Sequence, residues 1–114
     1  MDDFSMPNTT SRWGTMPSET NFVYPGKRPL SSMCPVIIVD EKGDVRLVIG
    51  GSGGIRIITS VALVLVRYLW LKQSIKEAIN GKRIHHQLVP NILEYEHGLD
   101  EVSVIGLSNV NAVL

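Results

Sequence analysis

The sequence predicts an α+β fold in which a long N-terminal loop precedes a β-hairpin, a long helix, a short strand and a terminal helix. Two runs rich in β-branched residues, 36–40 and 45–49, flank a short polar connection that contains Gly43, which is typical of a hairpin. Residues 55–80 are apolar at first and then amphipathic, which indicates one long helix or a helix pair. A hydrophobic content of 44% in 114 residues excludes a disordered tail and fits one domain at most.

The first third of the chain has the composition of a loop. Residues 1–34 contain prolines, asparagines, serines and threonines but no apolar periodicity. An irregular segment of this length is uncommon in a compact domain and is usually functional or wraps another element. We therefore divide the single domain, residues 1–114, into a loop region at 1–34 and a denser segment at 35–114.

The denser segment allows further predictions of structure. The unbroken apolar run at 36–39 indicates a strand buried on both faces. The long helix is expected to end at Gly81 in the left-handed position that follows many helices. Residues 92–95 are a candidate strand, and residues 100–107 are a candidate final helix.

The apolar stretch at 57–71 has two interpretations. It is close to the lower length limit for a membrane span, but Arg67 lies inside it. A helix that is apolar on all sides is more often buried in the core of a larger protein, and we favour that interpretation. The start of the chain shows no basic segment followed by an apolar run, so no signal peptide is predicted.

Charge and cysteine content narrow the functional classes. Eleven basic and eleven acidic side chains give zero net charge, which argues against a nucleic-acid partner. The single cysteine, Cys34, forms neither an internal disulfide nor a thiolate zinc site, and we expect it to be a small core residue. His85 and His86 are adjacent and would not share a face, so we predict structural roles for them and no metal site.

Two short motifs outside the predicted helices could bind charged groups. The adjacent carboxylates of Asp2 and Asp3 could hold an ammonium group, or they could simply be solvated. Ser31 and Ser32 lie on a proline-stiffened loop, where their hydroxyls could donate to a carboxylate or phosphate, or bond their own backbone in a turn.

A third motif, the glycine cluster at residues 50–54, lies between a predicted strand and a predicted helix. Glycines in this position allow backbone N–H groups to converge at the N-terminus of the helix, where negative charge is favoured. The cluster continues as Gly-Ile-Arg instead of Gly-Lys-Ser/Thr, so it is not a phosphate-binding P-loop, and its spacing does not fit a dinucleotide fingerprint. An oxyanion site remains as the functional interpretation.

The order of these motifs is more specific than any one of them. Met-Asp-Asp-Phe-Ser at 1–5, Pro-Gly-Lys-Arg-Pro-Leu-Ser-Ser-Met-Cys-Pro at 25–35 and Gly-Gly-Ser-Gly-Gly at 50–54 resemble the small subunit of gamma-glutamyltransferase, also called gamma-glutamyl transpeptidase or glutathione hydrolase. Arg-Ile-His-His-Gln-Leu-Val-Pro-Asn at 83–91 extends the resemblance, which covers residue 1 to about residue 107. The closing residues, 103–114, match poorly.

The resemblance implies an N-terminal nucleophile hydrolase, a four-layer αββα sandwich of which this chain would be part. In such an enzyme a threonine attacks the γ-glutamyl amide of glutathione or a related compound and forms an ester. The γ-glutamyl group then passes to water, an amino acid or a dipeptide, and no cofactor takes part. The resemblance also implies an extracellular or cell-surface enzyme, with any type II membrane anchor outside this chain.

The resemblance assigns roles to the polar motifs. Asp3, supported by Asp2, would bind the α-ammonium of the γ-glutamyl group. Ser31 and Ser32 would hydrogen-bond the α-carboxylate. These assignments match the charges of the groups, because an acidic pair would bind a cation and neutral hydrogen-bond donors would bind an anion.

The resemblance also assigns the oxyanion hole and shows what this chain lacks. The backbone N–H groups of Gly53 and Gly54 would stabilise the oxyanion. The nucleophilic threonine would lie upstream of the Asp-Asp motif, so it is absent from this chain, and so is the large subunit with its carboxylate-binding arginine. The large subunit and the N-terminal half of the small subunit are therefore the expected partners.

Two hypotheses of different classes follow. In the first, the chain is part of a working gamma-glutamyltransferase and supplies substrate recognition and the oxyanion hole. In the second, it is a short light-chain-like protein that binds or interacts without catalysis. An in-frame continuation upstream toward a threonine-initiated strand would favour the first, whereas an in-frame stop would favour the second.

Overall fold

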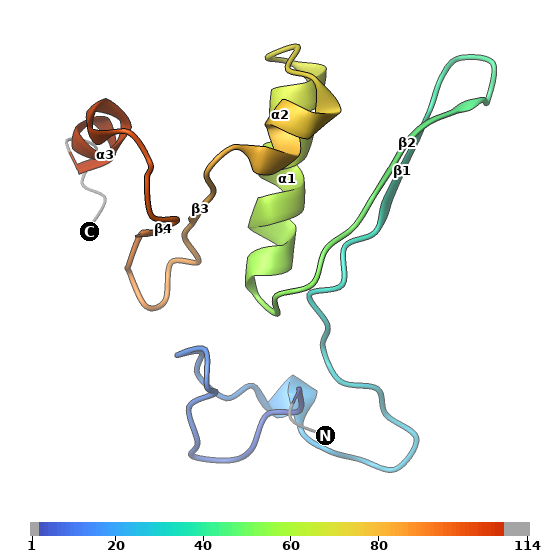
Figure 1. Cartoon of the computed structure of the whole chain (residues 1–114). Helices are drawn as coiled ribbons and strands as arrows, with labels where there is room; N and C mark the ends of the chain where they lie inside the picture. The colour runs from blue at the N-terminus through green and yellow to red at the C-terminus, as the bar shows by residue number, and fades with distance from the viewer. Residues whose placement is uncertain (1–2, 109–114) are drawn as a thin grey trace.

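The computed structural model describes residues 3–108 and has the α+β composition expected from the sequence (Figure 1). A long loop, interrupted by the short 3-10 helix η1 (Glu19–Asn21), occupies the N-terminal third. The elements that follow are, in order, β1 (Val36–Val39), β2 (Val45–Ile49), α1 (Arg56–Leu69), α2 (Ile75–Asn80), β3 (Ile84–His85), β4 (Glu94–Tyr95) and α3 (Glu101–Ser108).

The predicted hairpin is confirmed. Strands β1 and β2 pair antiparallel, with Val36 opposite Ile49. The connection is closed by the carboxylate of Asp40, which accepts the backbone N–H groups of Lys42 and Asp44 at 2.9 and 3.0 Å. An aspartate that bonds its own backbone in this way is a common turn device. The hairpin register therefore follows from local sequence.

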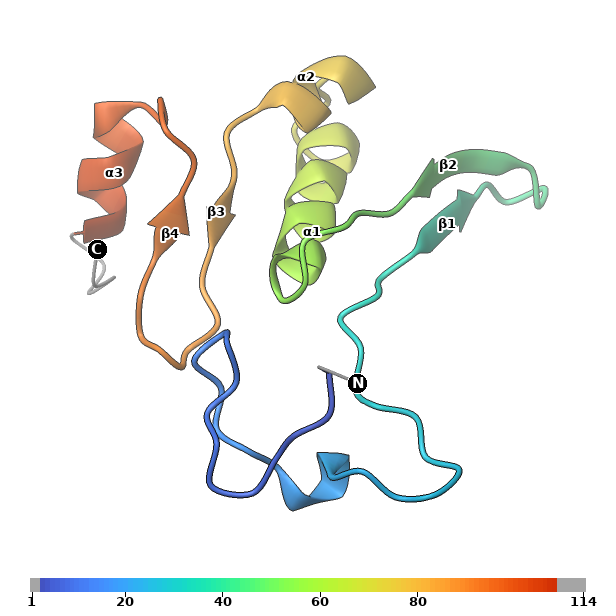
Figure 2. The ribbon, with the colours of Figure 1, turned by 60° about the horizontal axis from the view of Figure 1, so that its bottom comes forward.

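The prediction that β1 is buried on both faces is wrong for this chain. Ile37 is 65% exposed, and Val48 on the paired strand is 68% exposed. The hairpin projects away from the helices, and nothing in the described part of the chain covers this face (Figure 2). Cys34, just before β1, is half-buried. The unbroken apolar run shows which residues would be suited to burial, but no described residue covers Ile37 or Val48.

Of the two alternatives for residues 55–80, one long helix or a helix pair, the structure shows the pair, α1 and α2. A capping box starts α2: the Ser74 hydroxyl accepts the Glu77 N–H at 3.3 Å, and the Glu77 carboxylate accepts the Ser74 N–H at 2.8 Å. This reciprocal pattern satisfies N–H groups that a new helix would otherwise leave open. Before it, Lys72 has a φ of 56°, which ends the first helix. The break therefore lies at a cap signal within an otherwise helical apolar pattern.

The prediction of a left-handed Gly81 is also wrong. Gly81 has φ −64° and ψ 141°, an extended conformation that any residue can adopt. Glycine is favoured at this position for a steric reason, because a Cβ would lie 2.5 Å from Nη1 of Arg67. The half-buried guanidinium of Arg67 donates from Nη2 to the Lys82 carbonyl and packs against Gly81.

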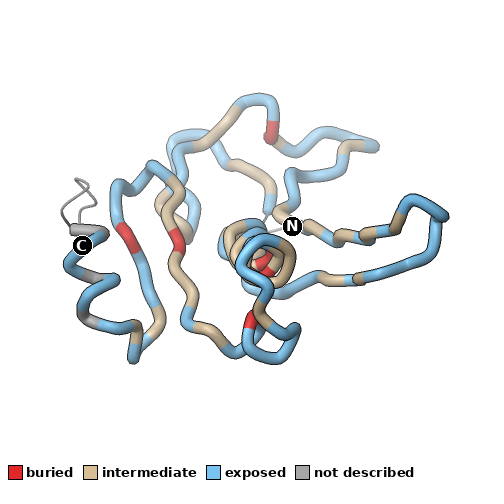
Figure 3. Tube along the Cα trace, turned by 90° about the horizontal axis from the view of Figure 1, so that it is seen from above, coloured by how far each residue is buried: buried red, intermediate tan, exposed pale blue. Residues whose placement is uncertain are grey.

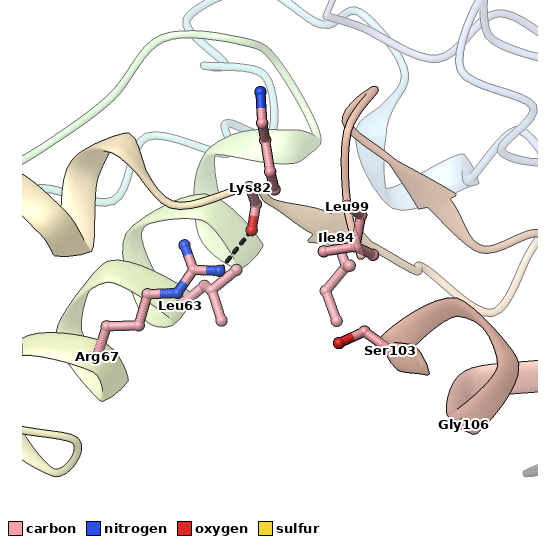
Figure 4. Close-up of a pocket in the computed structure, with 7 residues that line it drawn as sticks. All are labelled: Leu63, Arg67, Lys82, Ile84, Leu99, Ser103 and Gly106. Carbon is pink, nitrogen blue, oxygen red and sulfur yellow. Dashed lines mark hydrogen bonds between the residues drawn. The ribbon is translucent and has the colours of Figure 1, made fainter. Parts of the chain in front are cut away.

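A cavity of about 350 Å³ lies beside this contact, between α1, β3 and α3. Figure 4 shows Arg67 turned toward the carbonyl of Lys82, while the ammonium of Lys82 points away from it. The remaining walls come from Leu63, Ile84, Leu99, Ser103 and Gly106. Arg67 therefore tethers α1 to the segment that leads into β3.

Beyond α2, the remaining elements are short. Strands β3 and β4 form a two-residue antiparallel ladder in which His85 pairs with Glu94. Of the candidate strand at 92–95, only the last two residues form a strand. The predicted final helix is confirmed as α3, and Asp100 accepts the Ser103 N–H at 2.8 Å before its first turn.

The core is small and the molecule is flat. The buried apolar side chains in the described residues are Val61, Val64, Ala78 and Leu93 (Figure 3). The radius of gyration is 17.2 Å, whereas a compact chain of this length would have about 13 Å. The accessible surface of 8761 Å² compares with about 6200 Å² for a folded monomer of this mass.

The excess surface is partly apolar and belongs to the elements that should form a core. On α1, Val61 and Val64 are buried, but Ile58 and Val66 are 52% and 42% exposed. No helix among the described residues has both the length and the apolar character needed to cross a membrane. The expectation that α1 needs covering from outside this chain therefore agrees with its exposure.

This exposure predicts the behaviour of the isolated chain. We expect it to bind a dye such as anilinonaphthalene sulfonate and to melt without a cooperative transition, because exposed apolar surface favours loose or associated states. Calorimetry and dye fluorescence on a gel-filtered monomer would measure this. A sharp cooperative melt without dye binding would show that the small core is self-sufficient.

Candidate functional site

The first predicted site segment begins the described chain. Asp2 lies outside the described residues. Asp3 is exposed, and its backbone carbonyl accepts the Asn21 side-chain amide at 2.8 Å. No basic side chain of the described residues forms an ion pair with the Asp3 carboxylate. The backbone at Asp3 is therefore anchored, while its carboxylate stays available to a cationic group.

The two predicted serines differ in their surroundings. The Ser31 hydroxyl accepts the Met33 N–H at 3.1 Å, which is the turn chemistry that the sequence allowed as an alternative. Accepting this bond leaves the hydroxyl hydrogen of Ser31 available to donate. The Ser32 side chain is half-buried and makes no hydrogen bond within the described residues. Both serines can therefore still donate to a carboxylate.

The glycine turn has a conformation that requires glycine at two positions. Gly53 has φ +144° and Gly54 has φ +61°, values that side-chain-bearing residues rarely adopt. Their carbonyls accept the N–H groups of Arg56 and Ile57, at 3.3 and 3.1 Å, and so begin α1. Their own N–H groups have no acceptor among the described residues. The turn therefore offers two unpaired donors at the N-terminus of a helix, where negative charge is stabilised.

The side chain of Trp13 covers this turn. A Cβ at Gly54 would lie 2.6 Å from Cζ2 of the indole, so the ring occupies the space that a side chain would need. The guanidinium carbons of Arg12 and Arg56 lie 4.6 and 5.6 Å from the ring centroid, within cation–π range. The loop region and the helical region therefore meet at Gly54.

A chain of hydrogen bonds holds the Trp13 backbone. The Gln87 amide nitrogen donates to the carbonyls of Trp13 and Val89, at 2.9 and 2.7 Å. Its oxygen then accepts from Nε2–H of His85, 3.2 Å away, and Nδ1 of the same ring forms a hydrogen bond with the Thr59 hydroxyl, 2.8 Å away. This network links the first turn of α1 to the loop over the glycine turn.

The two histidines have the structural contacts expected of them. His85 is 7% exposed and has hydrogen-bond partners on both ring nitrogens. His86 contacts Asn91 through Nε2 at 2.9 Å. Across the described residues, no group of three histidine, cysteine or acidic side chains is placed to hold a metal ion.

An ion pair fixes the start of α1 to β4. Arg56 contacts Glu94 in bidentate geometry, at 2.7 and 2.9 Å. These hydrogen bonds raise the pKa of Arg56 and lower the pKa of Glu94 below its usual value. Because the folded-state pKa of Glu94 is lowered, the stabilisation is present above the ordinary carboxyl pKa and is lost as the pH falls through the lowered value. Both side chains are half-exposed, so the pair is screened by solvent.

Two residues, Asn21 and Trp13, connect the predicted site segments. Asn21 bonds both the Asp3 carbonyl and the Leu30 N–H, the latter at 2.9 Å, and so links the first segment to the residue before the serines. Trp13 links the same loop to Gly54. The loop lies at the end of α1 where the glycine turn enters the helix (Figures 1 and 2). No hydrogen bond within the described residues joins the glycine N–H groups to the aspartate or the serines.

Sequence reasoning missed Asn21 and Trp13. An asparagine in a polar, proline-rich loop has the signature of an ordinary turn residue, so composition does not reveal its burial. A single tryptophan among polar residues in the loop was a usable signal, because a large apolar ring needs a surface to pack against.

Comparisons with known proteins agree with this architecture. A model of the gamma-glutamyltranspeptidase family matches residues 1–112. Scoloptoxin SSD14 of Scolopendra dehaani is 55% identical over 96 residues, which are 84% of this chain and 17% of that protein. The glutathione hydrolase proenzyme of Arthroderma benhamiae is 41% identical over 104 residues, which are 91% of this chain and 18% of that protein. A mutant gamma-glutamyltranspeptidase of Helicobacter pylori matches at TM-score 0.89 and 34% identity, covering 99% of this chain and 61% of that chain.

The structural match confirms the expected class, an N-terminal nucleophile hydrolase fold, of which the described residues supply two two-stranded sheets and their helices. The chain belongs to the gamma-glutamyltranspeptidase family. It spans 17% and 18% of the length of the two curated relatives named above.

Proposed function

We propose that this chain forms the substrate-recognition part and the oxyanion hole of a gamma-glutamyltransferase. The enzyme would cleave γ-glutamyl amides, such as glutathione and its conjugates, and pass the γ-glutamyl group to water, an amino acid or a dipeptide. The observation that carries the proposal is the pair of unpaired N–H groups of Gly53 and Gly54 at the start of α1. Family membership supports the reaction class.

The charged ends of the γ-glutamyl group would be bound by the loop region. The Asp3 carboxylate, with Asp2 beside it, would accept hydrogen bonds from the α-ammonium. The hydroxyls of Ser31 and Ser32 would donate to the α-carboxylate. Charge-assisted hydrogen bonds of this kind are roughly twice as strong as neutral ones, so they orient as well as bind.

The glycine turn would act on the reacting carbonyl. When a threonine hydroxyl attacks the γ-carbonyl carbon, negative charge develops on its oxygen. The N–H groups of Gly53 and Gly54 would donate to that oxygen, and the helix dipole of α1 would add to the stabilisation. Collapse of the tetrahedral intermediate breaks the C–N bond, the leaving amine takes up the proton that the threonine hydroxyl gave up, and an ester remains for the acceptor to attack.

The nucleophile and the remaining walls of the site would come from other parts of the same enzyme. We propose the large subunit and the N-terminal half of the small subunit as the partners of this chain. Their support here is the exposed apolar surface of β1, β2 and α1, which would suit burial in a larger sandwich. An extracellular or cell-surface location is proposed from the family resemblance alone.

The oxyanion role predicts a specific loss of turnover. The test uses a chimera in which residues 1–107 replace the matching segment of an intact gamma-glutamyltranspeptidase. Gly54→Val should lower kcat for a γ-glutamyl anilide by about 10²–10³, because a side chain there displaces both the N–H and the Trp13 ring. KM should rise by less than kcat falls, since the lost donors act mainly on charge that develops in the transition state.

Gly51→Ala is the matched control. Its Cβ would meet the Val61 side chain at 3.8 Å, an ordinary contact, and its φ is not positive. This variant should keep nearly full kcat. Equal losses in both variants, or full turnover in Gly54→Val, would contradict the oxyanion assignment.

The ammonium site predicts a different kinetic signature. In the same chimera, Asp3→Ala should raise KM for the γ-glutamyl donor roughly thirtyfold, because losing a charged partner costs about 2 kcal/mol or more. Glu41→Ala removes the same charge from the exposed hairpin turn and should leave KM unchanged. An unchanged KM in a folded Asp3→Ala chimera would rule out the ammonium role.

A further inference from the structure

Asn21 is the most deeply buried polar residue of the loop region. The residue is 4% exposed, in a segment whose other residues are mostly exposed. A buried amide is stable only when its donors and acceptor are satisfied, so its partners indicate what it holds in place.

The amide nitrogen of Asn21 bonds the start of the described chain. It donates to the Asp3 carbonyl at 2.8 Å and to the Ser5 hydroxyl at 3.2 Å. The backbone adds a third bond, from the Ser5 N–H to the Asn21 carbonyl at 3.0 Å. Both N–H bonds of the amide are therefore used on the segment that carries Asp3.

The amide oxygen of Asn21 bonds the other segment. It accepts the Leu30 N–H at 2.9 Å, directly before Ser31. The intervening loop closes on itself, because Lys27 donates through its backbone to the Tyr24 carbonyl and through its ammonium to the Thr20 carbonyl. One side chain thus connects the backbone at Asp3 to the backbone that leads into Ser31.

We propose that Asn21 is a positioning residue that sets the spacing between the ammonium-binding and carboxylate-binding groups, and so confers selectivity for a free α-amino acid head group. This inference rests on the function proposed above. The ammonium and the carboxylate of the ligand share one carbon, so both can be bound only when their counter-groups are held at a fixed separation. Because Asn21 holds the loop at this separation before the ligand binds, binding does not lose the conformational entropy of a free loop.

Calorimetric titration of the chimera with L-glutamate and with glutarate, which lacks the ammonium, tests this inference. Asn21→Ala should weaken L-glutamate binding by about 10- to 100-fold, because it removes the link between the backbone at Asp3 and the backbone at Leu30, and ligand binding must then order the loop. Glutarate binding should change less than about threefold, since glutarate does not use the spacing. Asn80→Ala, at an exposed asparagine on α2, is the control and should change neither affinity.

Ser5→Ala keeps the inference testable if Asn21→Ala fails to fold. It removes one of the amide's bonds and should reduce the preference for L-glutamate over glutarate a few-fold. Equal weakening of both ligands, or no change in the preference, would overturn the positioning role. A chimera that shows the expected binding pattern but transfers no γ-glutamyl group would overturn the proposed function and leave the role of Asn21 standing.

Discussion

The packing of Trp13 against Gly54 is the contact on which the arrangement of the candidate site depends. The loop region carries the groups expected to hold the substrate's charges, and the glycine turn carries the donors expected to act on its carbonyl. These two parts are far apart in sequence, and the indole fills the space where a side chain on Gly54 would lie. The Gln87 side-chain amide also donates to the Trp13 carbonyl, at 2.9 Å. The turn therefore requires the positive φ of Gly54, and the packing of the loop on the turn requires that Gly54 has no Cβ.

Within the loop region, polar contacts provide most of the order that apolar burial provides elsewhere. Asn21 is buried and uses both N–H bonds and the oxygen of its amide, whereas several apolar residues of the hairpin and of α1, among them Ile37, Val48 and Ile58, remain exposed. Each of these hydrogen bonds replaces a hydrogen bond with water, so its net contribution to the free energy of folding is small. A buried polar group left without partners is costly, so such groups favour the one loop conformation in which all of them are bonded. The loop is thus held by contacts within the chain, while the exposed apolar surface of the sheets and helices is suited to covering by the partners proposed above.

The sequence predicted most elements because their signals are local. The hairpin and the final helix follow from apolar patterns and turn chemistry over a few residues. Residues 55–80 allowed either one long helix or a helix pair, and the cap formed by Ser74 and Glu77, which was not predicted from the sequence, accounts for the pair. Long-range contacts could not be predicted. The exposure of Ile37 depends on what covers the strand, the conformation of Gly81 depends on Arg67, and the burial of Asn21 depends on segments 18 and nine residues away. The motifs of the candidate site were found from their residue types, but the contacts that connect them were visible only in three dimensions.

The proposed γ-glutamyl site is tested most directly by a crystal structure of the chimera with bound L-glutamate, the product of γ-glutamyl hydrolysis. The α-ammonium should lie within hydrogen-bond distance of the Asp3 carboxylate, and the α-carboxylate should accept the hydroxyls of Ser31 and Ser32. The γ-carboxylate should accept the N–H groups of Gly53 and Gly54. Glutamate bound elsewhere, or glycine N–H groups that are paired with protein acceptors in the assembled enzyme, would show that these segments do not form one γ-glutamyl site.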